Sequence, residues 1–124
     1  MKQEEITKIV NKVYPLICAD YNSTALVDFH YNIYERLSGE KGMTGEVCAH
    51  AEYDWNKDKI YIYTSRMFTE EDIIRSLIHE CVHSIQFKVK FDAYYLCGET
   101  YDTHPYEIEA RDAEENWVNY KIKK

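Results

Sequence analysis

The residues best suited to chemistry lie in the stretch SLIHECVHSIQF, residues 76–87, which contains His79, Glu80 and His83. Residues four apart on a helix lie one above the other, so two imidazoles at this spacing can bind the same metal ion. Zinc prefers such nitrogen ligands in tetrahedral geometry, and a carboxylate beside the first ligand can take a proton from a water that the metal activates. The spacing therefore predicts a metal site with His79 and His83 as ligands and Glu80 as the general base.

The alternative is that these three residues form the solvated face of an ordinary helix. An exposed polar face accepts almost any residue types, and HExxH also occurs by chance in unrelated proteins. The two histidines lie almost opposite the centre of an apolar stripe, so we expect them on the side of the helix away from the core, where a metal site is favoured over a packed histidine. The stripe consists of Ile73, Ile74, Leu77, Ile78, Cys81, Val82 and Ile85.

The motif HECVH resembles the signature of the zincin metallopeptidases at His79, Glu80 and His83. The metzincin branch continues with a glycine and a third histidine, and SIQFKVKF, which follows here, contains neither. The gluzincin branch takes its third ligand from a glutamate on a later helix, often in the pattern Glu-x-x-Ala. HPYEIEARDAEENW matches this pattern at Glu107 and Ala110. The resemblance therefore implies a zinc ion bound by His79, His83 and Glu107.

Other residues near Glu107 are alternatives for the same site. Glu109 is the rival third ligand, because both glutamates flank the apolar stripe of their helix and periodicity does not choose between them. His104 is a weaker candidate, since it lies at the start of the helix rather than on a face. Enzymes of this kind often add a tyrosine or histidine that stabilises the oxyanion, and the candidates here are Tyr101, His104 and Tyr106.

The first half of the chain is expected to supply a helix and about three strands. Apolar residues at helical spacing predict a helix at residues 3–14, which Pro15 ends. Two β-rich runs flank the polar NKDK within residues 46–65 and predict a hairpin. Alternation in TALVDFHYNIYERL, residues 24–37, predicts a strand with these residues on one side: Val27, Phe29, Tyr31 and Ile33.

The helix that carries HECVH is expected at about residues 70–88. Thr69 precedes it and is followed three residues later by Asp72, which resembles a capping box. The stretch FDAYYLCGETYDTH, residues 91–104, is expected to be a loop, because a glycine and polar residues dominate its end.

The last predicted element is a helix with Pro105 at its first position and Thr103 or His104 near the cap. Its apolar stripe consists of Tyr106, Ala110, Ala113, Trp117 and Tyr120. The order helix, strand, hairpin, helix, helix predicts an α+β fold. Small gluzincins, often called minigluzincin-like, place a three-stranded sheet before the active-site helix and a glutamate helix after it. The resemblance thus implies a small zincin-like domain.

The same resemblance implies where a substrate binds. The strand IYIYTS, residues 60–65, is expected to form the edge of the sheet over the cleft. An extended peptide can add to such an edge as a further strand.

Composition limits the partners and the compartment. The 124 residues suit one domain, residues 1–124, and the net charge of −7 argues against nucleic acid as a partner, because a nucleic-acid groove needs clustered lysine and arginine. The N-terminal stretch lacks the apolar run of a signal peptide, and no segment approaches the length of a membrane span. The four cysteines form no CxxC pair and are typical of free thiols. We therefore expect a cytoplasmic monomer without a membrane partner.

Two hypotheses of function follow. The first is a zinc metallopeptidase that hydrolyses a peptide or protein substrate. The second is a binding or regulatory module that keeps the zincin fold without proteolytic activity. The presence of Glu80 favours the first, because a module that only binds has no need for a general base at this position.

Overall fold

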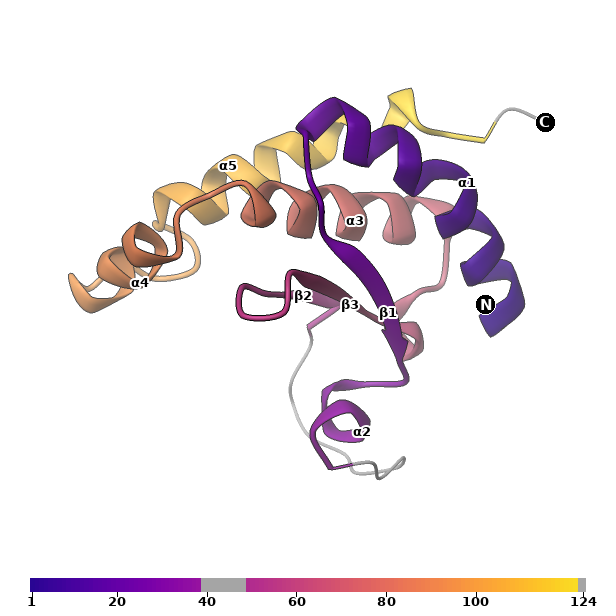
Figure 1. The fold of residues 1–124 in the computed structure, drawn as a ribbon, viewed down its shortest axis with the longest axis horizontal. Helices are drawn as coiled ribbons and strands as arrows, with labels where there is room; N and C mark the ends of the chain where they lie inside the picture. Colours follow the sequence, from indigo (N-terminus) through magenta and orange to yellow (C-terminus); the bar gives the residue numbers. More distant parts are fainter. Residues whose placement is uncertain (39–48, 123–124) are drawn as a thin grey trace.

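The computed structural model describes residues 1–38 and 49–122 of the chain. The described part is α+β, as predicted, with five α-helices and a three-stranded sheet (Figure 1). In chain order the elements are α1 (Gln3–Tyr21), β1 (Leu26–His30), α2 (Ile33–Ser38), β2 (Ala51–Asp54), β3 (Lys59–Tyr63), the short 3-10 helix η1 (Thr64–Arg66), α3 (Glu70–Ser84), α4 (Lys88–Leu96), α5 (Pro105–Ala113) and the 3-10 helix η2 (Glu114–Asn119).

Helix α3 is the central element of the fold. It packs against α1, α5, η2 and the strands β2 and β3, and Figure 1 shows it running between the sheet and α5. The predicted apolar stripe is buried, with Ile73, Leu77 and Ile78 among its fully inaccessible members. Ile85 is the exception and is 47% exposed, because α3 ends at Ser84 rather than near residue 88.

The predicted capping box at the start of α3 is confirmed. The backbone N–H of Asp72 donates to Thr69 Oγ1 over 3.1 Å, and the backbone N–H of Thr69 donates to Asp72 Oδ2 over 3.1 Å. A third donor, the N–H of Phe68, bonds to the same carboxylate over 3.0 Å. The cap fixes where α3 begins, and therefore which turn carries His79.

We expect Thr69→Ala to lower the free energy of unfolding by about 1 kcal/mol, because it removes the acceptor for the N–H of Asp72. Chemical denaturation monitored by circular dichroism measures the change. Thr7→Ala is the control, since Thr7 lies inside α1, where alanine is the better helix former. Equal losses in the two variants would show that the cap is not the cause.

The prediction that Pro15 ends the first helix is wrong, because α1 continues to Tyr21. Buried apolar residues lie at helical spacing on both sides of the proline: Ile6, Val10, Val13 and Ile17. Proline removes one helical hydrogen bond, which leaves the carbonyl of Asn11 without its partner. Asn11 is exposed, so water can replace that bond while the packing of the stripe continues.

The sheet has the order β1-β3-β2, with β1 parallel and β2 antiparallel to β3. The hairpin prediction is confirmed for its described residues, since β2 and β3 pair across the turn; residues 46–48 lie outside the described part. The expectation that the strand IYIY forms the edge of the sheet is wrong. Residues 60–63 belong to β3, which β1 covers on its other side through pairs such as Val27 with Ile60. The edge beside α3 is β2.

The strand predicted at residues 24–37 is only partly present. It ends at His30, and α2 begins at Ile33. The side chain of Asn32 accepts a hydrogen bond from the N–H of Glu35 over 2.8 Å, which favours a helical turn over continued alternation. Arg36 of α2 then donates to the hydroxyl of Tyr63 over 2.7 Å and covers the outer face of β3.

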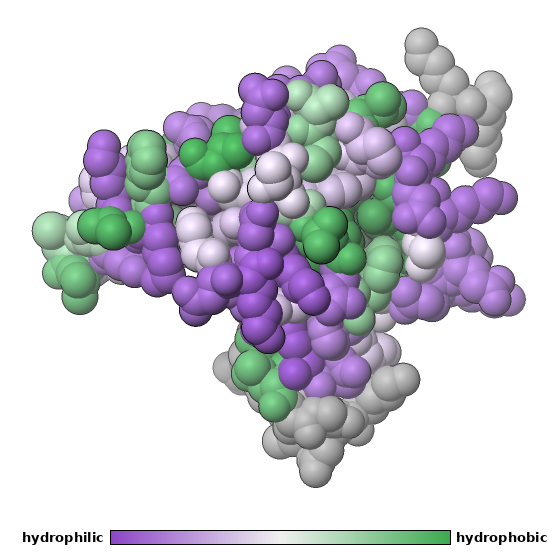
Figure 2. Space-filling view, in the orientation of Figure 1, coloured by the Kyte–Doolittle hydropathy of each residue, from purple (hydrophilic) through white to green (hydrophobic). Residues whose placement is uncertain are grey.

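The loop prediction for residues 91–104 is wrong for its first part, because helix α4 extends to Leu96; this helix has no buried residue. Gly98, with φ of 96°, follows the helix, and its N–H donates to the carbonyl of Tyr95 over 3.1 Å. Figure 2 shows hydrophobic residues gathered at the end of the molecule where α4 lies, in agreement with the exposure of Val89 and Leu96. The helix packs too little of its surface on the core for its spacing to be visible in the sequence. Among the described helices, none is long and apolar enough to span a membrane.

Candidate metal centre

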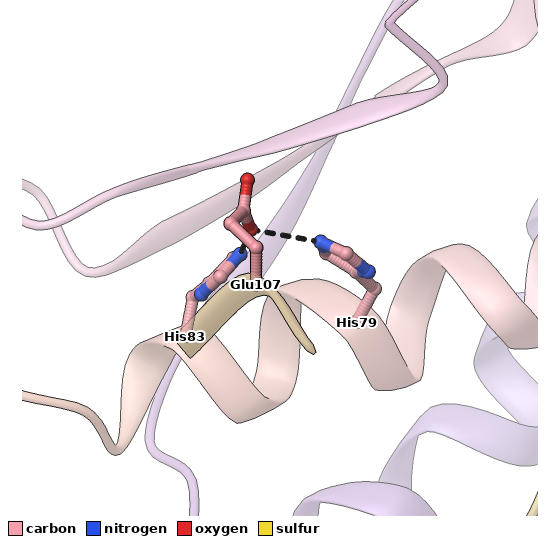
Figure 3. A group of neighbouring side chains, drawn as sticks. All are labelled: His79, His83 and Glu107. Atoms are coloured by element: carbon pink, nitrogen blue, oxygen red, sulfur yellow. Dashed lines mark hydrogen bonds and ion pairs between the residues drawn. The ribbon is translucent and has the colours of Figure 1, made fainter. Parts of the chain in front are cut away.

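Helices α3 and α5 bring His79, His83 and Glu107 together. One possible ligand atom from each residue lies within 4.8 Å of the other two, and all three residues are buried. Glu107 Oε1 is 3.3 Å from His79 Nε2 and 2.5 Å from His83 Nε2. Figure 3 shows the glutamate reaching from α5 toward the two imidazoles, which project from successive turns of α3. The structure thus brings together the three residues that the sequence predicts as ligands.

The two histidines lie on the face of α3 opposite the apolar stripe, as predicted, but this face is not exposed. His79 is 8% and His83 is 5% exposed. The ring of Trp55 lies 5.9 Å and that of Phe91 5.3 Å from the ring of His83, and Glu107 of α5 covers both histidines. The face is therefore covered by the β2–β3 turn, α4 and α5, which excludes the simple solvated helix face.

The start of α5 determines where Glu107 lies. Pro105 occupies the first turn, and Nδ1 of the N-cap residue His104 accepts a hydrogen bond from the N–H of Tyr106 over 3.0 Å, so the predicted helix start is confirmed. The other ring nitrogen of His104 donates to the carbonyl of Phe91 over 2.8 Å. Both nitrogens are thus engaged within α4 and α5, and His104 does not reach the centre as ligand or oxyanion stabiliser. Ala110 is fully buried, and its small side chain lets α5 approach α3.

The donor set fits a metal ion. Zinc–ligand bonds of about 2.0 Å in tetrahedral geometry place ligand atoms roughly 3.3 Å apart. The 3.3 Å between His79 Nε2 and Glu107 Oε1 matches this spacing, whereas His83 Nε2 lies closer to the same oxygen, at 2.5 Å. The Nδ1 atom of each histidine has its own partner, Glu114 Oε2 at 2.7 Å for His79 and Gln86 Oε1 at 2.7 Å for His83. These bonds orient the rings so that both Nε2 atoms face the same point, an arrangement common around protein-bound metals.

Charge at the centre also favours a cation. Burial lowers the pKa of His79, but hydrogen bonds to Glu107 and Glu114 outweigh burial and raise the pKa to about 10. Burial raises the pKa of Glu107, yet its contacts with His79 and His83 hold that pKa far below its usual range. Both shifts show that the carboxylates stabilise positive charge at this point. A divalent cation benefits from the same interactions.

Glu80 lies beside the three ligands and lines the same cavity. Its side chain is buried, and burial raises its pKa, while the neighbouring His79 and His83 lower it. Among the described residues, none forms a hydrogen bond with its carboxylate. The carboxylate is therefore free to receive a proton from a molecule in the cavity, and its role as a general base stays a prediction.

The cavity has a volume of about 640 Å³ and lies between the sheet edge and the helices α3 and α5. Residues Ala51 to Tyr53 of β2 form one wall, and Trp55 and Phe91 form another. Of the candidate oxyanion stabilisers, Tyr101 lines the cavity. The ring of Tyr106 instead packs 5.7 Å from that of Tyr94 and 6.0 Å from that of His104, and Tyr106 is not in the cavity wall.

The structure separates Glu107 from its rival Glu109. Glu109 is exposed, and its Oε1 accepts a hydrogen bond from Gln86 Nε2 over 3.1 Å. The two other histidines also lie outside the centre: His30 pairs with Glu35 over 2.8 Å, and His50 is exposed at the cavity rim. The choice between the two glutamates thus falls on Glu107, which the Glu-x-x-Ala pattern favoured.

Three residues at the centre were missed in the sequence. Gln86 lies three positions after His83, and Glu114 lies two helical turns after Glu107, so helical spacing offered a signal for both. Tyr95 donates from its hydroxyl to Glu107 Oε2 over 3.3 Å. It belongs to α4, where the sequence predicts a loop, and no residue spacing indicates it.

Comparisons with protein-family models, with curated proteins and with solved structures found no match to this chain.

Proposed function

We propose that this chain is a zinc-dependent peptidase that hydrolyses peptide bonds, with the gluzincin plan of the zincin metallopeptidases. The observation that carries the proposal is the convergence of His79, His83 and Glu107 beside Glu80 in one cavity. Two histidines and one carboxylate are a ligand set of catalytic zinc sites, in which a fourth position stays open for water or substrate. HExxH with a glutamate from a following helix is the pattern from which the sequence predicts this activity.

The residues of this chain have distinct roles in the proposed reaction. Zinc held by the three ligands would polarise the scissile carbonyl and lower the pKa of a water molecule to about 7. Glu80 accepts the proton of the attacking water and later donates it to the leaving amine. Burial of the Glu80 carboxyl, which raises its pKa, suits both halves of this transfer. Glu114 and Gln86 hold the two imidazoles in the orientation that binding requires.

The substrate would bind along β2. Within the described part of the chain this strand pairs with β3 on one side only, and its residues Ala51 to Tyr53 line the cavity. The backbone groups of an edge strand can pair with an extended peptide, which fixes the peptide by main-chain hydrogen bonds. A peptide in this position passes over Glu80 and the three ligands. We therefore propose β2, in place of the IYIYTS segment, as the strand that receives the substrate.

Removal and return of the metal test the proposal. We expect the zinc-loaded protein to cleave an unfolded protein substrate, a metal chelator to abolish cleavage, and added zinc to restore it. Zinc at about one hundred times its dissociation constant should also stabilise the fold by roughly 2.7 kcal/mol, because it binds the folded state. Mass spectrometry of the fragments and thermal unfolding with and without zinc measure the two effects.

Two results would contradict the proposed function, and each has a different meaning. Zinc that stabilises the protein without any cleavage would contradict the peptidase and support a binding or regulatory module. Absence of zinc uptake would contradict the metal centre and return HECVH to an accidental match.

A further inference from the structure

Tyr95 makes a polar contact between α4 and one of the metal-ligand candidates, Glu107. Its hydroxyl donates to Glu107 Oε2 over 3.3 Å, whereas Glu107 Oε1 lies against His79 and His83. The two oxygens of the same carboxylate therefore have different partners. Among the described residues, Tyr95 is the one that contacts Oε2 through a polar group.

Aromatic packing fixes the position of the Tyr95 hydroxyl. Its ring centroid lies 5.3 Å from that of Phe91 and 4.5 Å from that of His104. His104 is itself held by its bonds to the carbonyl of Phe91 and the N–H of Tyr106. Because His104 caps α5 three residues before Glu107, the hydroxyl and the carboxylate are positioned by the same small cluster.

We infer that Tyr95 is a positioning residue that keeps Glu107 a monodentate ligand, with Oε1 for the metal and Oε2 for the tyrosine hydroxyl. The inference rests on the metal centre of the proposed function. A carboxylate with two unoccupied oxygens can bind a metal ion through both, which fills a further coordination position. A hydrogen bond to one oxygen disfavours this and keeps a position open for water or substrate.

The test compares Tyr95→Phe with Tyr94→Phe. The first change removes the hydroxyl that reaches Glu107 and keeps the ring between Phe91 and His104. The second removes a hydroxyl from the neighbouring residue of the same helix, whose ring packs against His104 and Tyr106 and makes no contact with Glu107. Circular dichroism and thermal unfolding of both variants verify that the fold is retained. We expect both variants to fold, because α4 has no buried residue.

Two readouts are independent of catalysis. The first is the zinc dissociation constant, measured by competition with a chromophoric chelator. The second is the visible absorption of the cobalt(II)-loaded protein, since four-coordinate cobalt absorbs more intensely than five- or six-coordinate cobalt. We expect Tyr95→Phe to lose intensity in the cobalt spectrum, because the freed oxygen of Glu107 can then bind the metal, and to change the zinc dissociation constant by about 10–100-fold. Tyr94→Phe should resemble the wild type in both.

An unchanged cobalt spectrum and zinc affinity in Tyr95→Phe, with metal bound by the wild type, would overturn the inference and leave the metal centre intact. A wild-type protein that binds neither metal would overturn the inference together with the proposed function. The two failures are therefore distinguishable by the wild-type measurement alone.

Discussion

Glu107→Ala is expected to yield protein without tightly bound zinc, whereas Glu109→Ala keeps about one zinc per chain. Glu107 supplies the oxygen that lies against both imidazoles, and its loss leaves two nitrogen ligands on α3. Loss of a group that only orients a ligand costs about 10–100-fold in affinity, and loss of the ligand itself should cost more. Elemental analysis of the purified variants, with the zinc content expressed per chain, measures the difference.

Glu109→Ala is a matched control, because it removes the same side chain from the same helix two positions later. Glu109 is exposed, and among the described residues its carboxylate accepts a hydrogen bond from Gln86. Its loss should therefore leave the ligands in place and affect the orientation of His83 only indirectly. Zinc lost from Glu109→Ala and kept in Glu107→Ala would reverse the assignment of the third ligand. Zinc kept in both variants would place the third ligand elsewhere.

The part of the site that the sequence predicts is the part that local geometry determines. His79 and His83 converge because residues four apart on a helix project from successive turns, and a strong apolar stripe with a capping box locates that helix. The assignment of Glu107 as third ligand needs information beyond local geometry, since helical periodicity makes Glu109 equally suitable. Which glutamate faces α3 depends on how α5 is rotated about its axis, and the buried Ala110 and the capping by His104 set that rotation.

The parts that were mispredicted depend on contacts between distant segments. Strand β3 is central because β1 pairs with it in parallel. The sequence of β3 alone does not indicate this pairing. Helix α1 continues through Pro15 because the stripe on both sides of it packs into the core. The sequence does not indicate helix α4, because the aromatic residues Phe91 and Tyr95 pack on the ring of His104 rather than on the main core. Tyr95 was missed for the same reason.

Burial of the histidines shows a further limit of the amphipathic pattern. The apolar stripe of α3 indicates one covered face, and the opposite face was expected to be open. The structure covers that face with α5, α4 and the turn that carries Trp55, while leaving a cavity of about 640 Å³ beside the ligands. Polar residues on a helix can therefore be buried where several of them share one partner, here Glu107.

Glu80→Gln is expected to retain zinc and to lose peptide hydrolysis by a factor of about 10²–10⁴. Glutamine has nearly the shape of glutamate, so the cavity and the ligands should keep their arrangement. Its amide cannot accept the proton of the attacking water, which removes general-base catalysis. Cleavage rates of a fluorogenic peptide, measured with zinc-saturated protein, and zinc content per chain test both parts of the expectation.

Glu52→Gln provides the control for a lost negative charge in the same cavity. Glu52 lines the cavity from β2 and pairs with Arg36 over 2.9 Å, and none of its described contacts is with the three ligands. We expect this variant to keep most of the activity, since it changes the charge of the wall without removing the base. Equal losses in Glu52→Gln and Glu80→Gln would assign the effect to the electrostatics of the cavity. Full activity in Glu80→Gln would contradict the role of Glu80, because the reaction would then require a different proton acceptor.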